Sequence, residues 1–166
     1  ERPLGYSLKK IIAEDAGGLT ANHKLKGVIP GGMSAPILLP EEVEKATLDF
    51  ECMAELGSML GSGAITVIPD NQSMIDILKI TVDFFTHESC GQCTPCREGT
   101  GWLANIVASQ MRGKSGIESL DKIYNIASNM EGRTICALSD ACAMPTKAIV
   151  KKYRQELEMY LEQRLS

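Results

Sequence analysis

Three cysteines lie close together in the middle of the chain, at Cys90, Cys93 and Cys96. A spacing of three residues lets a single loop wrap a small metal cluster and present a thiolate at each bend, as bacterial ferredoxin segments do. Gly91 would relieve the crowding that a side chain causes in such a loop. Arg97 adds a positive charge nearby, and a helix beginning here would direct its first N–H groups toward an anionic centre. The segment therefore predicts a metal-binding loop.

A cluster of this kind needs a fourth thiolate, and Cys52, Cys136 and Cys142 can each supply it. Cys136 follows two predicted helices, which can run away from the first three cysteines and return. Cys142 lies between Ala141 and Ala143, a setting in which a free cysteine is usually a small buried hydrophobe. Cys52 lies far away in a predicted connector. Cys136 is therefore the favoured fourth ligand, Cys142 stays an alternative, and Cys52 and Cys142 are expected to be bystanders.

A structural zinc ion is the main alternative to an iron–sulfur cluster. Zinc bound by four sulfurs usually draws its ligands from two separated pairs, each on a short hook of the chain. Three ligands on one loop and a remote fourth are typical of iron–sulfur proteins instead. A redox-active disulfide uses two cysteines, so it would not explain the third cysteine of the loop. The spacing therefore favours a [4Fe-4S] cluster over zinc.

Composition limits the other classes of function. The chain has 166 residues, of which 44% are hydrophobic and 23% charged, which suits one or two domains with a real core. A formal net charge of −4 argues against a nucleic-acid binder with a general basic surface. No run of about 18 apolar residues predicts a membrane-spanning helix, and the start Glu1-Arg2-Pro3 does not resemble a signal peptide. The grouped cysteines favour a reducing compartment over a disulfide scaffold.

The elements that would position these residues fall into two parts. Residues 1–72 predict a small α+β unit, with a helix over 5–16, extended segments over 26–32 and 36–40, a polar connector over 40–60 and a strand over 64–68. Residues 73–166 show helical periodicity over 73–85, 99–111 and 117–130. Pro145 is expected to open a last helix as its first residue. Four helices joined by short loops predict a four-helix bundle.

Several segments resemble one known family. Residues 88–101, which contain the three grouped cysteines, closely resemble the cluster signature of the NADH-binding flavoprotein subunit of respiratory complex I. Residues 132–138 resemble that family's fourth-ligand segment, and residues 28–32 and 60–64 also resemble the family, in the same order. Two positions depart from it, because Ser139 and Cys142 stand where the family commonly has glycine and alanine.

The resemblance implies a fold and a cofactor. It implies a soluble-ligand-binding β-grasp domain within residues 1–72, followed by a helical [4Fe-4S]-binding domain over residues 73–166. Four cysteines, Cys90, Cys93, Cys96 and Cys136, would hold one cluster, which accepts electrons from FMN reduced by NADH and relays them to partner clusters. Ala137 and Leu138 would pass close to the flavin. The activity implied is that of an NADH:quinone oxidoreductase.

The resemblance also implies what surrounds the chain. The family's nucleotide and flavin sites precede this region, so we expect the chain to be a C-terminal portion, with FMN and NADH bound mainly by the part before it. Expected partners are other subunits of the complex I peripheral arm, including a [2Fe-2S] subunit, with no nucleic acid and no direct membrane insertion. The expected location is peripheral, on the cytoplasmic side of the bacterial inner membrane or the mitochondrial matrix side.

Two alternatives to complex I stay open. The diaphorase subunit of a soluble NAD-linked hydrogenase or formate dehydrogenase looks similar in this region. Some of these subunits carry further ferredoxin-like cysteines after the helices, and this chain has none after Cys142, which favours complex I. The remaining alternative is a redox-silent zinc module that only mediates assembly.

Overall fold

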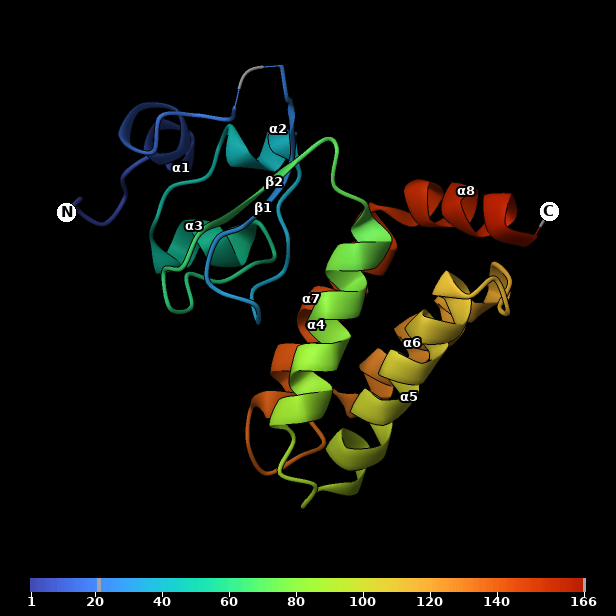
Figure 1. Ribbon diagram of the computed structural model, residues 1–166. Helices are drawn as coiled ribbons and strands as arrows, with labels where there is room; N and C mark the ends of the chain where they lie inside the picture. The colour runs from blue at the N-terminus through green and yellow to red at the C-terminus, as the bar shows by residue number, and fades with distance from the viewer. Residues whose placement is uncertain (21, 166) are drawn as a thin grey trace. The chain divides into compact units, whose positions relative to one another are not determined.

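The structure is a computed structural model and describes residues 1–20 and 22–165 (Figure 1). The chain divides into two compact units, Glu1–Gln72 and Ser73–Ser166. The fold is a mixture of helices with a small sheet, and the helices dominate. None of the helices in the described ranges is both long enough and apolar enough to cross a membrane.

The first unit holds the strands together with several short helices. Its elements are α1 (Leu8–Lys10), the π-helical turn η1 (Ile11–Asp15), β1 (Leu25–Ile29), α2 (Pro40–Val43), α3 (Phe50–Glu55) and β2 (Thr66–Pro69). The two strands pair antiparallel, with Val28 opposite Val67, and Leu38 forms an isolated bridge to Val28. Apolar side chains from the helices and strands fill one core beside this sheet, among them Leu8, Val28, Leu38, Val43 and Met53.

The prediction of a polar connector over residues 40–60 is wrong, because two short helices form there. Pro40 occupies the first turn of α2, where its missing N–H costs nothing. Asp49 caps α3, since its carboxylate Oδ1 accepts the Cys52 N–H at 2.7 Å. Val43 and Met53 are buried, so each helix contributes an anchor to the core. The apolar residues were too sparse to predict helices from periodicity, although the capping residues were visible.

Two glycine turns of the first unit approach each other closely. The Ser62 N–H donates to the Gly31 carbonyl at 3.1 Å, and the Gly32 N–H donates to the Ala64 carbonyl at 2.8 Å. A Cβ atom at Gly31 would lie only 2.5 Å from the Met59 carbonyl oxygen. Because backbone atoms cannot move aside as a side chain does, this contact requires glycine.

The second unit is helical. Its elements are α4 (Met74–Glu88), α5 (Thr94–Met111), α6 (Glu118–Met130), α7 (Leu138–Lys152) and α8 (Arg154–Leu165) (Figure 1). Helix α4 packs against α5 and α7, and α6 packs against the same two helices. Fully buried side chains from all four fill the space between them, including Leu78, Leu103, Leu120, Ile123 and Ile149. The helices predicted over 73–85, 99–111 and 117–130 are confirmed, although α5 begins five residues earlier than predicted.

Pro145 does not open the last helix, and that prediction is wrong. It lies inside α7, which begins at Leu138, and a break at Tyr153 then separates α7 from α8. A proline in this position cannot donate to the Ala141 carbonyl one turn earlier, which weakens the helix locally. Pro145 is itself buried, so its packing offsets the lost hydrogen bond. The helix signal before Pro145 was weak because that segment consists mainly of small residues.

Candidate metal centre

The three grouped cysteines lie on the turn that joins α4 to α5. Helix α4 ends at Glu88, Cys93 is the N-cap residue of α5, and Cys96 lies in the first turn of that helix. Cys90 is exposed, Cys93 half-buried and Cys96 buried, and all three are free thiols. Gly91 between them has φ +77°, a left-handed conformation that any other residue adopts at a cost. The turn therefore presents three sulfurs at increasing depth.

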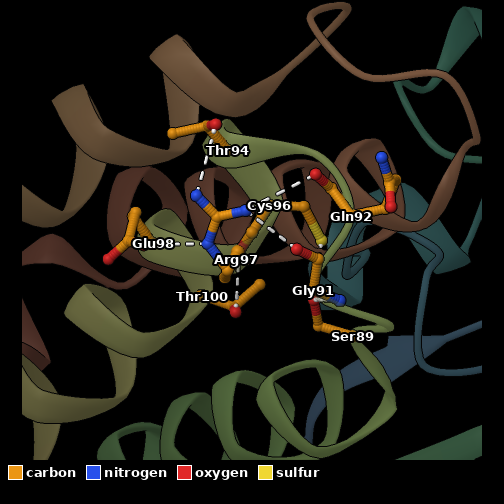
Figure 2. A network of polar contacts seen from close by, with 8 residues as sticks. All are labelled: Ser89, Gly91, Gln92, Thr94, Cys96, Arg97, Glu98 and Thr100. Atoms are coloured by element: carbon orange, nitrogen blue, oxygen red, sulfur yellow. Dashed lines mark hydrogen bonds and ion pairs between the residues drawn. The ribbon is translucent and has the colours of Figure 1, made fainter.

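Arg97 holds the backbone of this turn (Figure 2). Its Nη1 donates to the carbonyl oxygens of Gly91 at 2.9 Å and Gln92 at 3.4 Å. Its Nε donates to Glu98 Oε1 at 3.0 Å, and its Nη2 lies 3.4 Å from Thr94 Oγ1. The ion pair with Glu98 is nearly half exposed and adds little to stability. The main role of Arg97 is therefore to fix the two carbonyl groups that precede Cys93.

Hydroxyl groups secure Cys96 on both its side chain and its backbone (Figure 2). Ser89 Oγ lies 3.2 Å from Cys96 Sγ, and it also accepts the Gly91 N–H at 3.3 Å. Thr100 Oγ1, which is buried, donates to the Cys96 carbonyl at 2.9 Å. Cys96 is only 7% exposed, so little of this residue is in contact with water.

Cys136 lies on the turn between α6 and α7 and is exposed. Its carbonyl accepts a hydrogen bond from Thr134 Oγ1 at 2.9 Å. The turn is held by Asp140, whose Oδ1 accepts the Gly132 N–H at 2.6 Å, and by the buried Ser139, whose hydroxyl donates to the Met130 carbonyl at 3.1 Å. Ser139 is thus accommodated where the resembling family commonly has glycine, because its hydroxyl bonds the carboxyl end of α6.

The two remaining cysteines have different surroundings. Cys142 is completely buried within α7, and burial raises the pKa of its thiol to about 12. Because the thiolate is the form that binds a metal ion, the raised pKa makes Cys142 a poorer metal ligand than a thiol of ordinary pKa. Cys52 belongs to the first unit, where its sulfur accepts the Thr47 N–H at 3.4 Å. Cys142 lies close enough to Cys96 for the two thiols to interact electrostatically, so the role of both remaining cysteines as bystanders stays a prediction.

The structure brings the predicted ligands together only in part. It collects Cys90, Cys93 and Cys96 on one turn and places Cys136 on the turn before α7, a helix that packs against α5. In the ranges described, no group of three or more His, Cys, Asp and Glu side chains is already arranged to hold a metal ion. The predicted ligands therefore lie on the two turns that lead into α5 and α7.

The chemistry of the donor set fits an iron–sulfur cluster. All four predicted ligands are free thiols, the ligand type that such clusters use. Cys93 makes no side-chain cap hydrogen bond at the N-terminus of α5, so the first N–H groups of an 18-residue helix are left for another acceptor. Positive helix ends favour anionic centres such as thiolate-bound clusters.

Sequence reasoning missed Ser89 and Asp140 as site residues. A serine immediately before a cysteine segment is a usable signal, but its contact depends on how the turn folds. Ala137 and Leu138 were predicted near a flavin. Ala137 is the exposed N-cap residue of α7 and Leu138 is half-buried, so both follow Cys136 directly at the start of the helix.

Comparison with known proteins places these observations in a family. Residues 76–160, about half of the chain, match the family described as the NADH-ubiquinone oxidoreductase-F iron-sulfur binding region. The F subunit of the NADH-quinone oxidoreductase of Rickettsia bellii is 39% identical over 163 residues, covering 98% of this chain and 39% of that protein. An F subunit of the NADH-quinone oxidoreductase of Rhizobium meliloti is 39% identical over 164 residues, covering 99% of this chain and 39% of that protein.

Solved structures agree on the fold. A chain of an NAD+-reducing [NiFe]-hydrogenase in the H2-reduced state superposes with a TM-score of 0.83 at 25% identity, over 96% of this chain and 26% of that one. The air-oxidised form has a TM-score of 0.83 at 24% identity, over 99% and 29%, and supports the fold alone. The chain spans about 39% of the length of the curated relatives it matches. Because the family match runs from α4 into α8 and includes all four predicted ligands, this chain belongs to the family of the NADH-ubiquinone oxidoreductase-F iron-sulfur binding region.

Proposed function

We propose that this chain is the electron-transfer portion of the flavoprotein subunit of an NADH:quinone oxidoreductase. Cys90, Cys93, Cys96 and Cys136 are the proposed ligands of one [4Fe-4S] cluster. The observation that carries this proposal is the turn between α4 and α5, which presents three free thiols at the start of a helix. When bound, the cluster would supply one-electron transfer between FMN reduced by NADH and a cluster of a partner subunit.

The chain's own residues have distinct tasks in this proposal. Arg97 fixes the carbonyls of Gly91 and Gln92 and thereby the path of the ligand turn. The N-terminus of α5 offers N–H groups to an anionic centre. Burial of Cys96 limits water near its sulfur, which affects the reduction potential of whatever the sulfur binds.

The two compact units of the chain support an assignment to two domains with different roles. We assign residues 1–72 to a β-grasp-like domain with its connector, and residues 73–166 to a helical cluster-binding domain built on α4, α5, α6 and α7 as a four-helix bundle. The support is the separation into two compact units and the packing of those helices. Ala137 and Leu138, next to Cys136, are proposed to lie close to FMN, and the remainder of the subunit would bind NADH and most of FMN.

The proposed partners are the other subunits of a complex I peripheral arm, including a [2Fe-2S] subunit. The proposed location is peripheral, at the cytoplasmic face of the bacterial inner membrane or the matrix face in mitochondria. The names of the similar proteins support this assignment. A diaphorase role in a soluble NAD-linked hydrogenase is the second candidate, supported by the likeness to the hydrogenase chain with a TM-score of 0.83. The subunits that copurify with the protein distinguish the two.

The ligand assignment is tested by replacing single cysteines in the full chain and reconstituting it anaerobically with iron and sulfide. Cys136→Ser should abolish the wild-type spectrum and lower the iron content, because one thiolate ligand is lost. Cys52→Ser is the matched control and should load as the wild type does, since the Cys52 thiol contacts backbone groups of the first unit, accepting the Thr47 N–H and donating to the Lys45 carbonyl. A Cys136→Ser protein with a normal cluster would overturn the assignment.

A further inference from the structure

Ser89 stands apart from the other polar residues of the ligand turn because its side chain contacts a proposed ligand sulfur. Its Oγ lies 3.2 Å from Cys96 Sγ, a distance suited to a hydrogen bond between oxygen and sulfur (Figure 2). Arg97, by comparison, binds backbone carbonyls, Thr94 and Glu98.

The direction of this hydrogen bond follows from the second contact of Ser89. The Gly91 N–H donates to Ser89 Oγ at 3.3 Å, so the hydroxyl oxygen acts as an acceptor there. A hydroxyl carries one proton, and that proton remains available for the sulfur. A sulfur bound to iron has lost its own proton and can only accept. The Ser89 hydroxyl is therefore the donor once Cys96 is a ligand.

The surroundings hold Ser89 in this orientation and strengthen the contact. Ser89 follows directly after α4 and is half-buried. Its hydrogen-bond partner Gly91 is itself held in place, because the Gly91 carbonyl accepts a hydrogen bond from Arg97. Cys96 is 7% exposed, and a hydrogen bond in such a poorly hydrated place is electrostatically stronger than one in water.

We propose that Ser89 is a positioning residue that raises the reduction potential of the cluster by donating a hydrogen bond to Cys96 Sγ. This inference rests on the proposed function, in which Cys96 is a cluster ligand. A donor to a ligand sulfur withdraws electron density and stabilises the more negative, reduced state of the cluster. Loss of the hydroxyl should therefore make the cluster harder to reduce.

The test measures the midpoint potential of the cluster in the full chain by redox titration followed by electron paramagnetic resonance. Ser89→Ala removes the donor and should shift the potential downward, whereas Ser89→Thr keeps a hydroxyl and should stay near the wild type. Ser128→Ala is the matched control, since the Ser128 hydroxyl bonds only its own helix at the Tyr124 carbonyl, 2.8 Å away. An unchanged potential in a fully loaded Ser89→Ala protein would overturn the inference.

Two further readouts keep the inference separate from the proposed function. Iron and sulfide analysis of the wild type comes first, and a wild type without a [4Fe-4S] cluster overturns the proposed function itself. If Ser89→Ala does not load, resonance Raman spectra of the wild-type cluster in H2O and D2O decide the matter. Iron–sulfur stretching bands that do not move in D2O overturn the donated hydrogen bond. Bands that move support it where the shift is smaller in Ser89→Cys, whose thiol is a weaker donor, because the α5 N–H groups also exchange.

Discussion

At the scale of single residues, the ligand turn depends on groups that are not ligands. Arg97 joins the two carbonyls before Cys93 to the start of α5, and Ser89 contacts Cys96 Sγ. Gly91 supplies the φ of +77° that lets the turn reverse between the cysteines. The cysteines alone would not specify the path of the backbone between them, so the geometry of the site is distributed over these neighbours.

Replacement of Arg97 by lysine should weaken the turn without removing a ligand. Lysine keeps the charge but has a single ammonium group, which cannot reproduce the planar fork that reaches both carbonyls. We expect the cluster of Arg97→Lys to be lost several-fold faster to an iron chelator, followed by its visible absorbance. Arg112→Lys, an exposed arginine at the far end of α5, is the control and should lose the cluster at the wild-type rate. Equal rates for both variants would exclude a role for Arg97 in holding the turn.

The sequence predicted the chemistry of the site better than its contacts. The spacing of Cys90, Cys93 and Cys96 is local, so it could be interpreted without a fold, and the remote position of Cys136 followed from the helices between. The contact of Ser89 with Cys96 Sγ could not be predicted, because it depends on the conformation of a turn of a few residues. The same is true of Asp140, which reaches back eight residues to the Gly132 N–H.

At the scale of helices and strands, the fit between α5 and α6 depends on a small residue at their contact. A Cβ atom at Gly99 would lie 2.5 Å from Met130 Sδ and 2.6 Å from Met130 Cγ. Met130 is only 2% exposed, so it has little room to move aside. Gly101, on the same helix, has no neighbour within 4 Å of the corresponding position.

These two glycines form a matched pair for measuring that fit. Gly99→Ala should lower the free energy of unfolding by about 1 kcal/mol, because overpacking a core costs more than the gain in helix propensity returns. Gly101→Ala should raise it by about 0.5 kcal/mol, because alanine favours the helix and meets no obstacle. Urea denaturation of both variants measures the difference. If Gly99→Ala and Gly101→Ala had equal free energies of unfolding, the Met130 side chain would have to move aside without cost.

An ion pair links α6 to α8 and should make stability depend on pH. The hydrogen bond from Arg154 Nη1 to Asp121 Oδ1, at 2.5 Å, lowers the pKa of the Asp121 carboxyl below its ordinary value. A lowered pKa in the folded state contributes stability above the unfolded pKa of about 3.9, and this contribution is lost as the pH falls through the folded pKa.

Asp121→Asn should therefore lower the melting temperature slightly at pH 7, since the pair is largely exposed. The difference from the wild type should begin to shrink as the pH falls below about 4, where Asp121 of the unfolded chain becomes protonated, and should vanish once the pH lies below the lowered pKa of the folded state. Circular dichroism follows the thermal unfolding of the wild type and of Asp121→Asn, at pH 7 and again at a pH below 4. A difference that persists unchanged at low pH would assign the effect to packing rather than to charge.

The helices were predictable from periodicity where the apolar residues recur regularly, as in α4 and α6. The prediction failed where a local signal opposed the packing. Pro145 indicated a helix start, but α7 begins at Leu138 and continues through the proline. Residues on both sides of Pro145 are buried, and their packing stabilises the helix there. Residues 40–60 were too polar to indicate helices, yet Val43 and Met53 each anchor one in the core.

At the scale of the whole molecule, the chain is a family member that spans about 39% of the length of its curated relatives. Its two compact units have separate cores, and all four proposed ligands belong to the second. In the proposed electron transfer, the second unit would thus hold the cluster, and the remainder of the flavoprotein would bind NADH and most of FMN. A single cluster per chain is the property on which the entire proposal depends.

The most direct measurement is therefore the metal and acid-labile sulfide content of the anaerobically reconstituted full chain, together with its spectrum after one-electron reduction. A [4Fe-4S] cluster requires about four iron atoms and about four sulfides per chain, with a paramagnetic signal that appears on reduction. Cys136→Ser should lower the iron and sulfide content per chain, and Cys52→Ser should leave both unchanged. A colourless protein that binds about one zinc ion per chain and no iron would contradict the proposed function.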